Sequence, residues 1–186
     1  MAHTLIERQV LYDGSKVRLE IHHLEDADGR RFKAEVCQHP GAVVVLPLLD
    51  DQTVLLIRNF RHAVGQYLVE LPAGTLNRGE PPINAAGREL LEETGYLAHR
   101  LRPIMSFYAS PGILSEKLHA FAAFGLEMKR PALEVGEDIE LRPTRFQEAL
   151  EMIRTGEICD AKTIVTLMAY HRWGALNPVP FEGGVK

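Results

Sequence analysis

Three glutamates crowd the end of a short predicted helix in the stretch GRELLEETGY, residues 87–96. Glu89 and Glu93 are four positions apart and share one helix face, where like charges cost roughly 0.2–0.5 kcal/mol. Glu92 is fanned by about 100° from Glu93, and the negative end of the helix dipole disfavours all three carboxylates. A divalent cation would relieve this repulsion, and carboxylate oxygens suit Mg²⁺ or Mn²⁺, which typically bridge acids and phosphates. The cluster therefore predicts a metal site.

Other residues in the same region would frame this site. Arg88 is four positions before Glu92 and can hold that side chain in place. Glu80 lies near the helix start, where a carboxylate is favourable, so we expect a structural role for it. Gly74 allows the backbone to come close, so the carbonyl of Ala73 is a further candidate metal ligand.

The residues before the helix read as strands that would carry it. Residues 15–39 alternate apolar and polar residues around Asp28-Gly29, which predicts a β-hairpin. Residues 42–48 are continuously apolar, as in a strand buried on both faces. Two further strands are expected, over residues 53–58 and within residues 67–74.

The helix itself is predicted over residues 81–95, with Pro at its first positions and Gly95 at its end. The later elements are two strands flanking a turn at 110–116, an acidic loop leading into a strand over 132–143, and helices over 145–158 and 161–176. This order indicates one α/β domain with a mixed sheet between helices. We assign residues 1–40 to a β-rich extension, 41–176 to the domain and 177–186 to a poorly ordered tail.

Composition narrows the class of protein. Of 186 residues, 46% are hydrophobic and 25% charged, which is typical of a globular protein. The net charge of −4 gives no reason to expect nucleic acid as a partner, and no apolar run is long enough to span a membrane. Only Cys37 and Cys159 occur, without metal-ligand spacing, so a reducing cytoplasm is expected.

The glutamates belong to a longer spaced pattern. Gly74 is followed by five residues and Glu80, then by seven residues and RELLEETGY, residues 88–96. This pattern resembles the box of the Nudix hydrolases, which cleave nucleoside diphosphates linked to another moiety. The resemblance implies Mg²⁺, or Mn²⁺, with two or three ions in each site when substrate is bound. Ala73, Glu89 and Glu93 would hold metal, with Glu92 nearby.

Motifs on either side of the box are similar to one branch of that family. RNFRHAVGQYLVELPAG and YASPGILSEK resemble the ADP-ribose pyrophosphatases, and Pro111 lies sixteen residues after Gly95, as in that branch. GEDIELRPTRFQEALEMIRTGEICDAKTI is equally similar to the GDP-mannose hydrolases. The resemblance implies that Arg61, Glu116 and Glu35 contact substrate, together with the turn at Pro111. Glu35 would reach the nucleoside across a homodimer whose N-terminal sheets pack on the partner subunits.

The base that activates water is expected on the loop after the second long strand. There the resemblance favours Glu137, with Glu140 as second choice and Glu134 also available. One family variant has its base where this chain has Val135, and other relatives rely on box glutamates, which here include Glu92. The base therefore remains open among Glu137, Glu140, Glu134 and Glu92 at this point.

The substrate is expected to be a nucleoside-diphosphate sugar. The resemblance favours hydrolysis of ADP-ribose to AMP and ribose 5-phosphate, with GDP-mannose or a broad range of NDP-sugars as the alternative. ADP-ribose hydrolases often carry a base-stacking aromatic where this chain has Ser15 and Lys16, and Tyr12 or Phe32 would be the substitutes. A nucleoside triphosphatase and a non-catalytic nucleotide-binding module are the less favoured functions.

Overall fold

A computed structural model describes residues 3–129 and 138–174 of the chain. Within these ranges the elements are β1 (Thr4–Asp13), β2 (Arg18–Glu25), β3 (Arg31–Gln38), β4 (Ala42–Pro47), β5 (Thr53–Arg61), β6 (Gln66–Glu70), β7 (Ala73–Thr75), α1 (Pro82–Thr94), β8 (Tyr96–Tyr108), β9 (Lys117–Met128), β10 (Ile139–Arg145), α2 (Phe146–Thr155) and α3 (Ala161–Trp173). Residues 177–186, assigned to a tail, and most of the acidic loop lie outside the described ranges.

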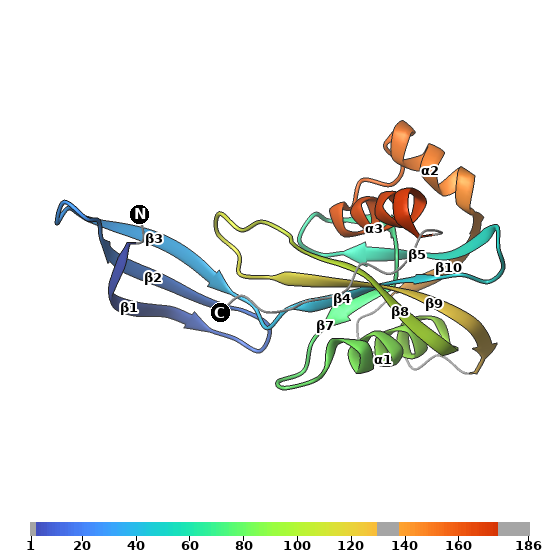
Figure 1. The fold of residues 1–186 in the computed structure, drawn as a ribbon, viewed down its shortest axis with the longest axis horizontal. Coiled ribbons are helices and arrows are strands. Elements are labelled where there is room, and N and C mark those ends of the chain that lie inside the picture. The colour runs from blue at the N-terminus through green and yellow to red at the C-terminus, as the bar shows by residue number, and fades with distance from the viewer. Residues whose placement is uncertain (1–2, 130–137, 175–186) are drawn as a thin grey trace.

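The extension is a separate three-stranded antiparallel sheet in the order β1-β2-β3, which projects from the rest of the protein in Figure 1. The predicted hairpin is present as β2 and β3. Its turn is closed by the Asp26 carboxylate, which accepts backbone N–H bonds from Asp28 and Arg30 at 2.9 Å, while Gly29 takes φ 79°. Strand β1 was not predicted, because every one of its residues is exposed and no buried face marks it.

A mixed four-stranded sheet in the order β7-β4-β9-β8 forms the centre of the domain. β4 runs parallel to β9 and antiparallel to β7, and all six of its residues are buried. In Figure 1, α1 covers one face of this sheet and α3 the other. The sheet is thus the mixed sheet between helices that the sequence predicts.

A second sheet, β10-β5-β6, lies on the α3 side, with α2 beside it (Figure 1). Inward side chains of β4 and β5, such as Val44 and Leu56, pack with Leu167 of α3 in one core cluster. A smaller cluster joins Val43 of β4 to Leu90 of α1. Side chains alternate along β4, so successive residues enter the two clusters and fix α1 against the sheet.

Helix α1 has the signals expected of it. Pro residues stand at its start, and its end is a left-handed Gly95 at φ 73° whose N–H donates to the Leu91 carbonyl at 2.9 Å. Ala85, Ala86 and Leu90 are fully buried, and Glu89 and Glu93 follow Ala85 at steps of four residues, so the buried side of the helix also carries these two glutamates toward β7. None of the helices in the described ranges is long and apolar enough to cross a membrane.

Candidate functional site

Gly74 on β7 makes room for one of the clustered carboxylates. A Cβ atom built on Gly74 would lie 1.9 Å from Cδ of Glu89 and 2.1 Å from each of its carboxylate oxygens. Any other residue at this position would occupy the space that Glu89 fills. The predicted close approach of the backbone at Gly74 is confirmed, and its cause is the Glu89 side chain.

Glu93 approaches the same strand one residue earlier. Its Oε2 accepts the backbone N–H of Ala73 at 2.9 Å. Glu93 is 3% exposed and Glu89 is 9% exposed, so two carboxylates of one helix face are buried against consecutive residues of β7. Such burial is costly for carboxylates unless they are hydrogen-bonded or bind a cation.

Arg88 holds the acidic cluster together. Its guanidinium donates to both oxygens of Glu80, at 3.0 and 2.9 Å, to Glu89 at 2.7 Å and to Glu92 at 3.0 Å. A fifth bond reaches the carbonyl of Thr75 at 3.2 Å. The predicted support of Glu92 by Arg88 is confirmed.

These hydrogen bonds shift the pKa values of Arg88 and Glu80. The hydrogen bond with Glu80 raises the pKa of Arg88, and Glu89 and Glu92 raise it further against the desolvation of the guanidinium. The same pair lowers the pKa of Glu80 below its ordinary value of 4.5, chiefly through the Arg88 hydrogen bond. Glu80 therefore has the structural role expected of it, although its partner is Arg88 and not the helix N-terminus.

The donor set fits Mg²⁺ but not a closed structural metal site. Among the described residues, no three His, Cys, Asp or Glu side chains are grouped so as to hold an ion. Mg²⁺ commonly needs only one or two protein carboxylates, with waters and substrate phosphates completing its shell. Glu89 and Glu93, buried beside the Ala73–Gly74 backbone, provide two such carboxylates.

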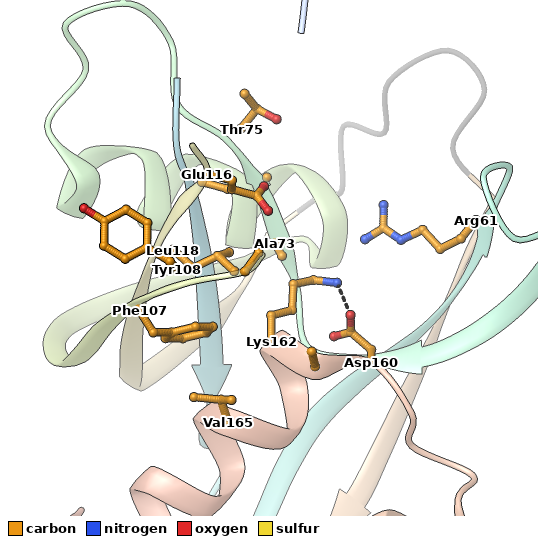
Figure 2. Close-up of a pocket in the computed structure, with 14 residues that line it drawn as sticks. Arg61, Ala73, Thr75, Phe107, Tyr108, Glu116, Leu118, Asp160, Lys162 and Val165 are labelled. Carbon is orange, nitrogen blue, oxygen red and sulfur yellow. Dashed lines mark hydrogen bonds and ion pairs between the residues drawn. The ribbon is translucent and has the colours of Figure 1, made fainter. Parts of the chain in front are cut away.

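A cleft of about 340 Å³ opens beside β7. Ala73 and Gly74 form one wall, and Figure 2 shows Arg61, Glu116 and Lys162 around the space in front of them. Two of these three side chains, Arg61 and Glu116, were predicted from the sequence. Arg61 ends β5 and Glu116 is the residue before β9, so the tertiary structure brings both to the side of β7.

Lys162 is a charged residue of the cleft that the sequence reasoning missed. Its Nζ donates to Oε2 of Glu70 at 2.6 Å and to Asp160 at 2.9 Å. Nη2 of Arg61 forms an ion pair with the other oxygen of Glu70, also at 2.6 Å. Glu70 is fully buried, so one carboxylate positions two cations from β5 and α3 at the cleft.

Some signals for this arrangement were present in the sequence. Glu70 lies within the strand predicted over residues 67–74, and its ion pair with Arg61 joins that strand to the end of β5. Asp160 caps α3 by accepting the N–H of Thr163 at 3.0 Å, as an Asp before a helix predicts. The segment CDAKTI therefore indicated a helix start, but nothing local indicated that it would face the cleft.

The loop that carries Glu116 is fastened to the end of the extension. The N–H of Cys37 donates to the Ile113 carbonyl at 2.7 Å, and the N–H of Ser115 donates to the Cys37 carbonyl at 3.0 Å. Nδ1 of His39 lies 3.6 Å from Oε1 of Glu116. These contacts hold Glu116 at the rim of the cleft.

Other predicted residues lie away from this cleft. Among the described residues that line it, Pro111 and Glu35 are absent; both are exposed, in the β8–β9 turn and on β3. Glu140 is on β10, where its carboxylate lies 3.6 Å from Arg58, and it does not line the cleft either. Glu134 and Glu137 fall outside the described residues, so the choice of base stays a prediction.

Comparisons with known proteins agree with this architecture. Residues 38–166 match the family model described as the NUDIX domain. A protein of Bacillus subtilis (strain 168) named ADP-ribose pyrophosphatase is 37% identical over 160 residues, covering 85% of this chain and 86% of the relative.

A protein of Escherichia coli (strain SMS-3-5 / SECEC) named GDP-mannose pyrophosphatase is 38% identical over 178 residues, covering 88% and 92% of the two chains. A solved structure described as an ADP compounds hydrolase shares the fold, with a TM-score of 0.82 at 21% identity. That match covers 93% of this chain and 94% of the other.

Proposed function

This chain belongs to the Nudix family, and from that premise we propose that it is a Mg²⁺-dependent hydrolase of a nucleoside-diphosphate sugar. The favoured substrate is ADP-ribose, cleaved to AMP and ribose 5-phosphate. The relative named ADP-ribose pyrophosphatase supports this choice, since the match covers most of both chains. The observation that carries the proposal is the fit of Glu89 against Gly74, because any side chain at residue 74 would collide with the Glu89 carboxylate.

In this proposal, one set of residues binds the metal and another binds the diphosphate. Glu89, Glu93 and the Ala73 carbonyl are the proposed metal ligands, with Glu92 beside them, and two or three ions are proposed per site when substrate is bound. Bound Mg²⁺ would supply charge neutralisation for the diphosphate and activation of water. Arg88 keeps Glu89 and Glu92 in place through its bonds of 2.7 and 3.0 Å.

The cations of the cleft bind the diphosphate oxygens. The guanidinium of Arg61 suits two oxygens at once, and the amine of Lys162 adds a point charge. Both are already oriented by Glu70, so little side-chain entropy is lost on binding. Glu116, Glu35 and Pro111 are the further proposed substrate contacts, from the cleft rim, the extension and the β8–β9 turn.

A carboxylate must also accept a proton from the attacking water. Glu137 is the proposed base, with Glu140 and Glu92 as the alternatives. Among these, the carboxylate of Glu92 is held by Arg88 and that of Glu140 lies near Arg58. A comparison of Glu137→Gln, Glu140→Gln and Glu92→Gln decides among them, because loss of the base lowers kcat by about 10²- to 10⁴-fold.

The extension supports a homodimer. Strand β1 is exposed along its whole length and carries large apolar side chains, with Leu5 39%, Ile6 50% and Leu11 52% exposed. Exposed apolar patches of this kind mark interaction sites. We propose that the β1-β2-β3 sheet packs on a second copy of the chain, which would also place Glu35 near the partner's cleft. Light scattering should give twice the mass of 20.8 kDa; a monomer at micromolar concentration would contradict this.

A second candidate substrate is GDP-mannose, or a broad range of NDP-sugars. The relative named GDP-mannose pyrophosphatase favours it, since its identity of 38% is close to the 37% of the relative named ADP-ribose pyrophosphatase. Both substrates present the same diphosphate to the same cleft. The difference lies in the base and the distal sugar.

Phosphate-product release from ADP-ribose, GDP-mannose, ADP-glucose, NADH and dGTP, with Mg²⁺ and with EDTA, tests the proposal. Turnover of ADP-ribose that EDTA abolishes is the expected result. Glu93→Gln should remove it, whereas Glu148→Gln, a matched change at an exposed residue of α2, should not. A preference for GDP-mannose would replace the substrate and keep the site, and turnover of none of the five would overturn the proposed hydrolase.

A further inference from the structure

A second and larger cleft, of about 820 Å³, lies at the end of β7, where Thr75 and the residues after it line it. Thr75 lines both clefts, and Glu89 lines the larger one. The walls of the larger cleft are the β1–β2 turn of the extension, the linker after β3, the segment after β7 and the middle of α1. A substrate cut beside Gly74 therefore has room for one half in each cleft.

The basic residues of this second cleft are of two kinds. Arg18 is already paired, at 2.9 Å from Glu20 and 4.0 Å from Asp13. Arg88 is occupied by the acidic cluster described above. Their charges are neutralised within the protein.

Lys16 and Arg78 form the second kind. Both line the cleft, Lys16 from the extension and Arg78 from the segment after β7, and both are exposed. Neither has an ion-pair partner within 4.0 Å among residues 3–129 and 138–174. The two positive charges come from separate walls and are not neutralised.

Among residues 3–129 and 138–174, those that line this cleft include no Phe, Tyr or Trp. A base would therefore find no aromatic ring to stack on among these residues, and the apolar part of the lining is limited to aliphatic side chains such as Val17 and Leu76. Two uncompensated cations instead match a group that carries two negative charges, and Lys and Arg are the side chains that bind phosphate oxygens.

We propose that the second cleft binds an additional phosphate, one outside the diphosphate, carried by one half of the substrate. The preferred substrates are then nucleoside-diphosphate sugars with a phosphate ester on a ribose hydroxyl. Lys16 and Arg78 are the residues that select them. This inference deepens the proposed function and rests on it.

The test compares kcat/KM for ADP-ribose with kcat/KM for ADP-ribose 2′-phosphate. A charge-assisted hydrogen bond to phosphate predicts a preference of about tenfold for the phosphorylated substrate in the native enzyme. Lys16→Ala and Arg78→Ala should each remove most of this preference and change kcat/KM for ADP-ribose by less than about twofold. The preference should also fall as salt is raised, because both cations are exposed.

Lys33→Ala and Arg172→Ala are the matched controls, since each removes one exposed cation that does not line this cleft. The inference is overturned if the native enzyme shows no preference, if both variants weaken the two substrates equally, or if the controls behave like the variants. In each of these cases hydrolysis of ADP-ribose itself would leave the proposed function standing.

A binding measurement without turnover distinguishes failure of the phosphate site from failure of the proposed hydrolase activity. Calorimetric titration in EDTA compares adenosine 2′,5′-bisphosphate with AMP for the native protein and both variants. Tighter binding of the bisphosphate that depends on Lys16 and Arg78 supports the phosphate site even if neither diphosphate is hydrolysed. Equal binding of the two nucleotides overturns it.

Discussion

Substitution of Gly74 by Ala tests whether the close contact of β7 with α1 positions Glu89, the proposed metal ligand. The new Cβ would lie 1.9 Å from Cδ of Glu89, so the carboxylate must retreat by about 1.5 Å to reach an ordinary contact of 3.4 Å. The atoms in the way are the end of a flexible side chain, and φ at Gly74 is not positive. We therefore expect the overall fold to tolerate the added Cβ, whereas the site loses the native position of the Glu89 carboxylate.

The two effects differ in size. The fold loses the Arg88–Glu89 hydrogen bond of 2.7 Å, about 1.5–3 kcal/mol for charged groups, and the other partners of Arg88 remain. In contrast, a displacement of about 1 Å at a reacting site costs on the order of 100-fold in rate. We expect Gly74→Ala to lower kcat/KM by about 100-fold and to weaken activation by Mg²⁺, with a small change in the free energy of unfolding.

A double-mutant cycle shows whether Glu89 transmits the effect. In a Glu89→Ala background the obstructing carboxylate is gone, so adding Gly74→Ala should change kcat/KM by less than about twofold. Gly87→Ala is the control on the same helix, because its Cβ meets only Leu101 at 3.6 Å. That control should stabilise the fold by about 0.5–1 kcal/mol and leave activity unchanged. Additive losses in the cycle would refute the reasoning.

Two further predictions concern the charged groups around the site. Glu70→Gln removes the buried anion shared by Arg61 and Lys162, so the free energy of unfolding should fall by about 3 kcal/mol in urea titrations and KM should rise; unchanged values of both would contradict the shared role. The lowered pKa of Glu80 predicts stability that is present above its unfolded pKa of about 4.5 and lost as pH falls through the folded value, because the unfolded state then binds the proton more tightly. The difference in Tm between the native protein and Glu80→Gln should thus be largest near pH 7 and shrink below pH 4.5, whereas a constant difference would exclude the Arg88–Glu80 pair as its source.

Local patterns in the sequence predicted the elements that have a buried face or a defined end. α1 follows from its two prolines, its buried Ala and Leu spacing and Gly95, and β4 follows from its unbroken apolar run. Strand β1 was missed, since all its residues are exposed and it has neither a buried face nor a defined end. The predicted end of the second helix was also too late, because α2 stops at Thr155 and the buried Ile158 lies beyond it.

The acidic cluster and its frame could be predicted from short-range spacing. Arg88, Glu89, Glu92 and Glu93 are close in the chain and share one helix, so helical geometry alone relates them. Only the tertiary structure decided which residues meet them. The cleft joins Arg61 and Lys162 through Glu70, whose partners come from β5 and α3, 9 and 92 residues away in the chain. Such pairings depend on how the two sheets pack, and short-range spacing carries no information about them.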